Sequence, residues 1–209
     1  MADNYLEKRE QELREARPKV VRNHLSLDSL LKRNRSYRGY DRSREVSRED
    51  LLSLLQVSSW VGSGMNAQPL RYKLVTGADT ALVHPLVHLG AALPDEALPH
   101  QGEEPSAYIV IASVAPENKV VDIDMGIAAQ SILLKAVEMG LGGIFILNFD
   151  APALQQALEM PLKPLAVLGI GKPSEKIFLL PTHNPSALTY YRKEGIHYVP
   201  KLYPEDLVL

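Results

Sequence analysis

The clearest hydrophobic pattern in the chain lies between Asp122 and Asn148, where a long apolar stretch is followed by glycines and a second apolar run. Residues 123–139 are mostly apolar or small, and among their polar side chains are Asp124, Ser131, Lys135 and Glu138. Because these four recur at spacings of seven, four and three, they share one stripe of a helix. A helix with so narrow a polar stripe is normally covered on most sides, so the pattern predicts a central core helix.

The residues that follow predict where this helix ends and a strand begins. Glycine readily adopts the left-handed conformation that ends helices, and three glycines come next: Gly140, Gly142 and Gly143. The run Ile144–Leu147 is too apolar for an edge strand with one face in water, so it predicts a buried strand. The pattern also allows the helix to lie at a subunit interface, where three small residues would permit close approach: Gly126, Ala128 and Ala129.

Three helices are predicted on the N-terminal side of this centre. The charged residues 1–22 predict an N-terminal helix, and residues 25–31 predict a second, short one. Ser47 can cap a third helix, with Asp50 as the reciprocal cap, and this helix should run to about residue 59. It is expected to bury four leucines: Leu51, Leu52, Leu54 and Leu55.

Further strands and helical segments complete the regular pattern. Apolar runs predict strands at residues 71–76, 107–114 and 164–173. Residues 79–89 predict a helix that is disturbed at Pro85, and Asp150 is placed to cap a short helix. Strands that alternate with helices indicate an α+β protein, in which helices and strands form separate layers.

Two segments lack a clear helical or strand period. Residues 90–106 contain three prolines and several acids, and a loop of this length in a compact domain is a candidate lid. Residues 174–209 predict an extended C-terminal arm with a turn near Glu194–Gly195. Since the chain has no internal repeat and no flexible linker, we expect a single domain over residues 1–209.

The composition narrows the classes of function. The chain has 209 residues, of which 45% are hydrophobic and 23% charged, enough apolar material for a sizeable core. A net charge of −2 gives no general attraction to nucleic acid or to an anionic membrane. The absence of cysteine excludes disulfides and thiolate chemistry. A charged N-terminus and the lack of a membrane-length apolar run lead us to expect a cytoplasmic protein.

The first candidate site is the segment Arg35–Arg38, with two arginines and a serine hydroxyl close together. Guanidinium groups match phosphate oxygens, and the hydroxyl of Ser36 adds a donor, so this segment can hold a phosphate. The alternative is a solvated basic loop balanced by nearby acids.

The second candidate is the loop 63–69, with the sequence SGMNAQP. The amides of Asn66 and Gln68 offer donors and acceptors that suit the edge of a heterocycle with carbonyl and imide groups. The alternative is a plain connection between a helix and a strand.

Other familiar motifs are absent or incomplete. The glycines after the central helix do not form the dinucleotide fingerprint, and residues 169–174 lack the spacing of a phosphate-binding loop. His84 and His88 have a metal-ligand spacing, but Pro85 lies between them, so no zinc site is expected. No nucleophile elbow marks a catalytic serine.

In their order along the chain, three segments resemble the nitroreductase family of FMN-dependent oxidoreductases. They read RSYRGY from Arg35, SGMNAQPLRY from Ser63, and DIDMGIAAQSILLKAVEMGLGGIFILNFD from Asp122. The family has an Arg-rich RRSxRxF opening, an SxxNxQPW loop and a GxAxxxxxLxAxxxGLG helix that leads into an apolar strand. The resemblance covers roughly residues 30–175, and the tail VPKLYPEDL is similar to the family's C-terminal basic segment.

This resemblance implies a mixed α+β sandwich made by an intertwined homodimer, with two FMN sites at the interface. Three residues would hold the phosphate and ribityl end of FMN, with Lys201 as a further phosphate contact: Arg35, Ser36 and Arg38. The partner subunit would line the flavin with Ser63, Met65, Asn66 and Gln68. A stretch whose backbone N–H typically points at flavin N5 would cover the ring: Phe145, Ile146, Leu147 and Asn148.

The sequence departs from the family pattern at three places. Asn34, within the same cofactor-binding segment, stands where the family has its first arginine, and only Arg33 is nearby. Leu70 replaces the tryptophan of the QPW motif. The second basic residue of the tail is missing, because Leu202 follows Lys201.

The activity implied by the resemblance is hydride transfer from NADH or NADPH, through flavin N5, to a nitroaromatic, a quinone or a similar small oxidant. No side-chain acid or base, no metal, no nucleic acid and no membrane enters this scheme. The alternative is a non-catalytic flavin-binding or interaction protein on the same fold.

Overall fold

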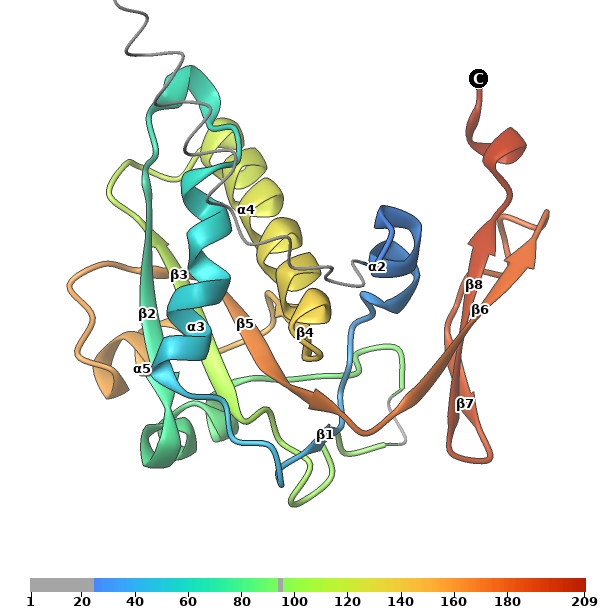
Figure 1. Ribbon diagram of the computed structural model, residues 1–209, viewed down its shortest axis with the longest axis horizontal. Helices are drawn as coiled ribbons and strands as arrows, with labels where there is room; N and C mark the ends of the chain where they lie inside the picture. Colours follow the sequence, from blue (N-terminus) through green and yellow to red (C-terminus); the bar gives the residue numbers. More distant parts are fainter. Residues whose placement is uncertain (1–24, 94–95) are drawn as a thin grey trace, which may run out of the picture.

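The computed structural model describes residues 25–93 and 96–209. The predicted N-terminal helix over residues 1–22 lies outside this described part of the chain. The described residues form a five-stranded main sheet with helices on both faces, and a separate three-stranded C-terminal sheet (Figure 1). This mixed arrangement confirms the predicted α+β class.

The main sheet is organised around its longest strand, β5 (Pro164–Pro173). β3 (Ala107–Ser113) and β4 (Gly142–Ile146) both pair antiparallel with β5. Because Ile170 pairs with a residue of each, β3 and β4 must lie on opposite edges of β5. β2 (Leu70–Thr76) pairs with the far side of β3, and β1 (Tyr40–Asp41) pairs with the end of β5. The structure therefore confirms, to within about one residue, the strands predicted at residues 71–76, 107–114 and 164–173.

Four α-helices accompany the main sheet in the described part of the chain. They are α2 (Leu27–Arg33), α3 (Arg48–Leu55), α4 (Lys119–Glu138) and α5 (Ala151–Ala157). The short 3-10 helices are η1 (Gln56–Ser59), η2 (Gly64–Asn66), η3 (Gly77–Leu82), η4 (His84–Leu86) and η5 (Pro204–Leu207). Two caps follow from the sequence as predicted, namely the reciprocal Ser47–Asp50 pair before α3 and Asp150 before α5.

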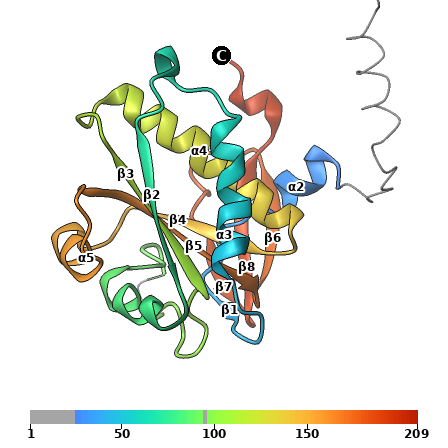
Figure 2. The same cartoon turned by 60° about the vertical axis from the view of Figure 1, so that its left-hand side comes forward.

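The hydrophobic core has two halves, one on each face of the main sheet. Ile109 and Ile111 of β3 point to one half, where they pack with α3 and α4, which lie over this face (Figure 2). Tyr108 and Val110 point to the other half, which includes Leu154 of α5. This alternation is the two-residue period of a strand that is covered on both faces, and it explains why β3 reads as a continuous apolar run.

Helix α4 crosses the molecule beside the main sheet, and its capping explains its length. Asn118 accepts hydrogen bonds from the backbone N–H groups of Val120 (2.9 Å) and Val121 (3.3 Å) at the start. The helix ends before Gly140, whose positive φ of 75° suits a residue without a Cβ. α4 is the predicted central helix, and it begins a few residues earlier than the apolar pattern indicated.

The exposed side of α4 differs from the predicted polar stripe. Asp124 is only 4% exposed, whereas Ile123 and Ile127 are 51% and 41% exposed. The carboxylate is buried because it accepts hydrogen bonds from the segment around η2, described below. An apolar stripe therefore faces outward on this helix.

Two of the three glycines after α4 belong to β4 and do not end the helix. A Cβ on Gly142 would lie 2.7 Å from the ring atoms of Tyr37, so glycine is needed there for close approach. β4 is also an edge strand of its sheet, since it pairs only with β5 among the described strands. Its faces are nevertheless covered, with Ile144 and Ile146 in one half of the core and Phe145 against the other, so neither face is in water.

Two other sequence-based predictions were wrong. Leu52 is 46% exposed, because it lies on the outer face of α3 while Leu51 and Leu54 are fully buried. The α-helix itself ends at Leu55, and η1 continues it as a 3-10 turn to Ser59. The helix predicted over residues 79–89 is instead two 3-10 turns, η3 and η4, with Pro85 inside the second.

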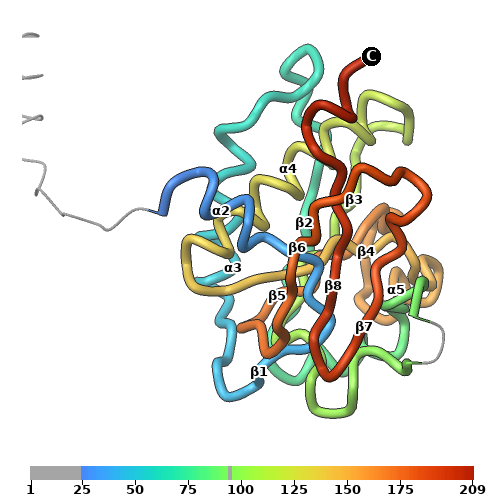
Figure 3. Tube along the Cα trace, turned by 90° about the vertical axis from the view of Figure 1, so that its right-hand side faces the viewer, coloured from blue at the N-terminus to red at the C-terminus, as the bar shows by residue number. Residues whose placement is uncertain are grey.

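The C-terminal arm folds into a sheet of its own. β6 (Lys176–Thr182) and β8 (Ile196–Leu202) are parallel, and β7 (Tyr191–Lys193) is antiparallel to β8. The predicted turn lies at Glu194–Gly195 between β7 and β8. We call these three strands the C-terminal sheet; Figure 3 shows it in front of the main body.

Candidate functional site

A cavity of about 380 Å³ lies between the main body and the C-terminal sheet. Its walls come from the segment before β1, from α4 and β4, and from the inner face of the C-terminal sheet. We call it the arginine cavity, and its lining residues are Asn34, Arg35, Ser36, Arg38, Gln130, Leu133, Gly143, Phe145, Ile177, Tyr190, His197, Val199 and Lys201.

Arg38 is the most buried cation of the cavity, at 8% exposure. Its Nη1 donates to the carbonyl of Ser36 (2.9 Å), and its guanidinium carbon lies 4.8 Å from the centre of the Tyr190 ring. Its Nε is buried and has no hydrogen-bond partner among the described residues. An unpartnered donor on a buried cation is costly, so this arginine is suited to an anionic ligand.

Arg35 also has a buried Nε without a hydrogen-bond partner, but its side chain is more accessible than that of Arg38. Its Nη2 donates to the carbonyl of Leu31 (2.7 Å). Burial lowers the pKa of Arg35 from its usual value, yet arginine stays charged at neutral pH. Within residues 25–93 and 96–209, no ion pair with a carboxylate neutralises Arg35, Arg38 or Lys201.

The backbone between the two arginines is fixed against β4. Ser36 forms a parallel bridge with Gly143, and the Tyr37 backbone N–H donates to the Gly143 carbonyl (3.2 Å). The Tyr37 hydroxyl donates to the carbonyl of Arg33 (2.7 Å). These contacts place Arg35 and Arg38 at the edge of the main sheet, beside Phe145.

The C-terminal sheet supplies the opposite wall. His197, Val199 and Lys201 alternate along β8 and share the inner face, as the two-residue period of a strand requires. Lys201, predicted from the family tail, therefore lies with Arg35 and Arg38 in one cavity. The same alternation could have found His197 and Val199 from the sequence, whereas nothing in the pattern pointed to Tyr190, Gln130 or Ile177.

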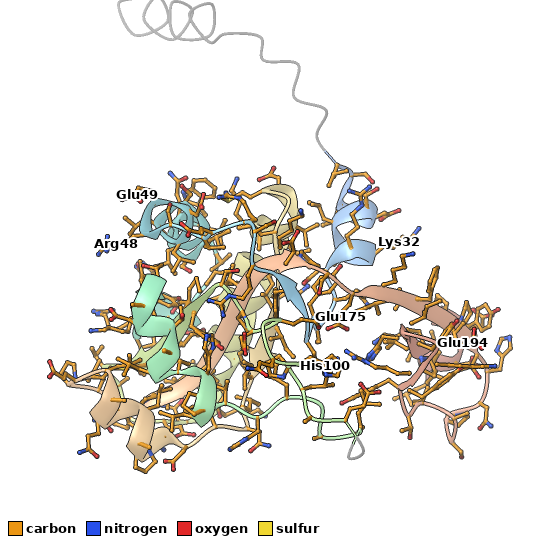
Figure 4. The ribbon with its side chains drawn as sticks, turned by 90° about the horizontal axis from the view of Figure 1, so that it is seen from below. Lys32, Arg48, Glu49, His100, Glu175 and Glu194 are labelled. Carbon is orange, nitrogen blue, oxygen red and sulfur yellow. The ribbon has the colours of Figure 1, made fainter. Side chains whose placement is uncertain are left out.

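A second group of charged residues lies beside the cavity, with Arg192 on the same face of the C-terminal sheet as its register partner His197, and the sequence pattern did not reveal it. Arg192 of β7 donates from Nη2 to Glu175 Oε2 (2.8 Å), from Nη1 to Glu96 Oε2 (3.0 Å), and from Nε to His197 Nδ1 (3.4 Å). Glu175 Oε1 also accepts a hydrogen bond from the backbone N–H of Arg38. Figure 4 places Glu175 at the junction of the main body and the C-terminal sheet.

His197 is 2% exposed and lies between cationic groups. Burial, together with the nearby charges of Arg38 and Arg192, lowers the pKa of His197 to about 4. The imidazole is therefore neutral at physiological pH. Since Nδ1 accepts from Arg192, the proton of the neutral ring belongs on Nε2.

The loop 63–68, which we call the amide loop, lies away from the arginine cavity. Ser63 Oγ donates to Asp124 Oδ2 (2.6 Å), and the Gly64 N–H donates to Asp124 Oδ1 (2.9 Å). Leu133, which lines the cavity, follows Asp124 by nine residues, or about two and a half helical turns, so the two face opposite sides of α4. Within one chain, α4 therefore separates the amide loop from the cavity.

Of the four predicted residues of the amide loop, Ser63 is hydrogen-bonded to Asp124, whereas Met65, Asn66 and Gln68 point to the protein surface or to each other. Met65 is 97% exposed, and the Gln68 side-chain amide donates to Asn66 Oδ1 (3.1 Å). Met65, Asn66 and Gln68 all have positive φ values. Ser63 and Gln68 line a second cavity of about 250 Å³, between η1 and β2.

The predicted stretch from Phe145 to Asn148 is divided. Phe145 lines the arginine cavity, but Ile146 is buried in the core on the other side of β4. Leu147 is 63% exposed, and the Asn148 carbonyl accepts a hydrogen bond from the backbone of His88. Six predicted site residues therefore meet in the cavity: Asn34, Arg35, Ser36, Arg38, Phe145 and Lys201.

The candidate lid and the histidine pair have structural contacts. From the described part of residues 90–106, the Ala92 N–H donates to the Tyr190 hydroxyl (3.3 Å), and Glu96 pairs with Arg192, so this segment packs against the C-terminal sheet. His84 Nδ1 lies 2.7 Å from the Tyr108 hydroxyl. Among residues 25–93 and 96–209, no group of three His, Asp or Glu side chains is placed to hold a metal ion. None of the helices that the structure describes is long and apolar enough to cross a membrane.

The fold and the cavity together define an α+β protein with a cavity lined by cationic side chains beside its main sheet. The sequence model of the nitroreductase family matches residues 31–172, which is more than half of the chain. The protein therefore belongs to the nitroreductase family. None of the curated proteins matches its sequence.

Solved structures of other family members share the fold. A putative nitroreductase from Exiguobacterium sibiricum, solved in complex with FMN, is 19% identical, with a TM-score of 0.59 over 74% of this chain and 91% of that one. The FMN- and NADPH-dependent nitroreductase NfnB from Sphigopyxis sp. strain HMH is 18% identical, with a TM-score of 0.59 over 72% and 89%. A putative NADH dehydrogenase/NAD(P)H nitroreductase from Bacteroides thetaiotaomicron is 21% identical, with a TM-score of 0.55 over 70% and 86%.

Proposed function

We propose that this protein is an FMN-dependent oxidoreductase that takes a hydride from NADH or NADPH and reduces a small oxidant such as a nitroaromatic or a quinone. The observation that carries the proposal is the arginine cavity, where Arg35 and Arg38 each have a buried Nε without a hydrogen-bond partner and no carboxylate partner among the described residues. A cavity with this charge suits an anionic ligand with a large apolar part.

The residues of the cavity fit FMN in size and in chemistry. Its volume of about 380 Å³ falls in the range of roughly 300–1,000 Å³ that is typical of small-molecule sites. Arg35, Arg38 and Lys201 provide positive charge for a phosphate, and the hydroxyl of Ser36 adds a donor. The apolar walls suited to a ring system are Leu133, Phe145, Ile177 and Val199.

The descriptions of two relatives support this cofactor. The Exiguobacterium sibiricum protein was solved with FMN, and the Sphigopyxis protein is FMN- and NADPH-dependent. Both share the fold of this chain, and membership of one family makes the same cofactor the simplest hypothesis here. The choice between NADH and NADPH is left to measurement.

The proposed chemistry asks little of the side chains. When bound, FMN supplies the hydride-accepting and hydride-donating centre of the reaction. Arg35 and Arg38 would hold the anionic part of the cofactor, and Phe145 and Leu133 would exclude water from the apolar part. The neutral His197 lines the cavity and would carry its proton on Nε2, and no acid–base pair is required.

We also propose that the working form is a homodimer in which the amide loop of one copy meets the arginine cavity of the other. α4 exposes a stripe of apolar residues, Val120, Ile123 and Ile127, at 41–51% each. Met65 of the amide loop is almost fully exposed nearby. Exposed apolar groups gathered in this way mark protein–protein contacts, and a second copy would supply the amides that a single chain keeps out of its own cavity.

An absorbance spectrum of the purified protein, followed by FMN titration, tests the cofactor. We expect a yellow protein, or uptake of about one FMN per chain, and anaerobic bleaching of the flavin by NADH or NADPH. A colourless protein that takes up no FMN would overturn the proposal. Bound flavin that neither nicotinamide bleaches would favour a non-catalytic flavin-binding protein, an alternative suggested by Asn34 at the position of the family arginine.

A further inference from the structure

Beside the arginine cavity, Arg192 donates hydrogen bonds to three acceptors from different parts of the chain. It contacts Glu96, Glu175 and His197, and its side chain is only 15% exposed. Glu175, at 9% side-chain exposure, accepts from Arg192 through one oxygen and from the backbone N–H of Arg38 through the other. Both carboxylate oxygens of Glu175 are thus engaged without the Arg38 guanidinium.

We propose that Arg192 is a positioning residue for the cofactor site: by engaging Glu175, it keeps the guanidinium of Arg38 free for the anionic ligand of the cavity. This inference rests on the proposed function for the identity of that ligand, FMN. Arg192 would keep the Arg38 guanidinium free in the same way for any other anion that binds there.

The physical reason lies in the competition for one buried carboxylate. Glu175 already accepts a hydrogen bond from the Arg38 backbone N–H, so without Arg192 the guanidinium of the same Arg38 is a cation that could neutralise it. A buried charge without a partner is strongly unfavourable, so Glu175 would draw the Arg38 guanidinium towards itself. An arginine paired in this way would bind an external anion less well, because that anion would have to displace the carboxylate.

The surroundings of Arg38 agree with this role. Its guanidinium lies over the Tyr190 ring, a cation–π contact that holds the group without using its donors. The Tyr190 ring stacks on His197 (5.1 Å between ring centres), and His197 Nδ1 accepts from Arg192. Arg192 therefore supports Arg38 from two directions, through Glu175 and through the His197–Tyr190 stack.

Double substitution at Arg192 and Glu175 tests the inference. FMN dissociation constants are measured for the wild type, Arg192→Met, Glu175→Gln and the double variant, with Arg48→Met as a matched control on α3. Arg192→Met should weaken FMN binding about 10-fold or more. Glu175→Gln should stay within about 3-fold of the wild type, because its amide oxygen can still accept from the Arg38 N–H.

The FMN affinity of the double variant decides between the two explanations. If Arg192 acts by occupying Glu175, adding Glu175→Gln to Arg192→Met should restore the affinity to within about 3-fold of the wild type. A role in packing alone would leave the double variant as weak as Arg192→Met, or weaker, and would overturn the proposal. Equal affinity of Arg192→Met and the wild type would overturn it too.

The role of Arg192 can be tested even if the protein does not bind FMN. If the wild type takes up no FMN, the same variants are compared through the rise in Tm caused by inorganic phosphate. A rise in the wild type that is lost in Arg192→Met and regained in the double variant would support the positioning role without FMN. A wild type that responds to neither FMN nor phosphate would refute both proposals.

Discussion

The arginine cavity and the amide loop both contain polar residues that the family resemblance assigns to one cofactor, but they differ in how those polar groups are satisfied. In the cavity, Arg35 and Arg38 keep buried donors without partners among the described residues. In the amide loop, Ser63 is bonded to Asp124, and Gln68 to Asn66. The cavity therefore keeps donors that a ligand could pair with. The polar groups of the amide loop are instead paired within the chain.

This difference indicates what a single chain can and cannot build. The cations converge because the segment before β1, β4 and the C-terminal sheet all meet at one end of the main sheet. The amide loop is anchored on the opposite side of α4, so only a second copy of the chain could bring it to a cavity. Substitutions in the arginine cavity and in the amide loop test this difference separately.

The largest effect is expected from Arg38→Met. The substitution keeps much of the side-chain volume but removes the charge and the free Nε donor, and charge-assisted hydrogen bonds to a ligand are worth about 10- to 100-fold in affinity. FMN titration followed by fluorescence quenching measures the change. Arg48→Met, on the exposed face of α3 (Figure 4), serves as the control and should bind FMN as the wild type does. Unchanged affinity in Arg38→Met would remove this arginine from the site.

A smaller loss, about 10-fold, is expected from the double substitution Asn66→Gly and Gln68→Gly, which removes two neutral side-chain amides. Glycine suits both positions because their φ values are 54° and 47°. Co-expression with Arg38→Met chains then distinguishes a one-chain site from a two-chain site. In a two-chain site, each mixed dimer regains one intact site of its two, so tight FMN binding should return at about half of the sites of the purified mixed dimer. No return of tight binding would show that the amide loop does not complete a partner's cavity.

Lys201→Met should have a modest effect. Lys201 is exposed at the rim of the cavity, where an ion pair is screened by water, so its loss should weaken FMN binding by about 2- to 5-fold. Lys193, on the other face of the C-terminal sheet, provides the matched control because it pairs in register with Ile196 and points away from the cavity. Equal losses for Lys193→Met and Lys201→Met would mean that only the overall charge of this sheet matters.

The smallest effect concerns pH. The pKa of His197 in the folded protein is lowered to about 4, whereas in the unfolded chain it should be near 6.5. Between these values the unfolded chain binds a proton that the folded protein does not, so stability should fall as the pH decreases from about 6.5 to 4. His197→Gln should reduce this dependence of Tm on pH, and His88→Gln, at an exposed position, should not. A pH profile identical to that of the wild type in His197→Gln would contradict the buried neutral state.

Much of the fold could be predicted because local patterns decide it. The Ser47–Asp50 capping box, the turn at Glu194–Gly195 and the apolar runs of β3 and β5 depend on residues that are close in sequence. The errors arose where the same local pattern allowed two tertiary settings. Leu52 has the same character as Leu51, and only the position of the sheet decided which of them is buried.

The site was predicted in part for the same reason. Arg35, Ser36 and Arg38 stand together in the sequence, so their shared chemistry is visible before folding. Arg192 and Glu175 are 17 residues apart, and each is an ordinary charged residue in its own surroundings. Their link to Arg38 exists only because β6 and β7 fold back beside the main sheet.

The sequence alone determined the class of the fold, the helix caps and the basic segment whose side chains could bind a phosphate. These features depend on periodicity, on short-range hydrogen bonds and on residues that are adjacent in the chain. The tertiary structure decided that Asp124 is buried while Ile123 and Ile127 face outward, that Gly142 makes room for the Tyr37 ring, and that Arg192 shares Glu175 with Arg38. Burial and charge pairing depend on contacts between distant segments, and no local pattern in a single sequence specifies those contacts.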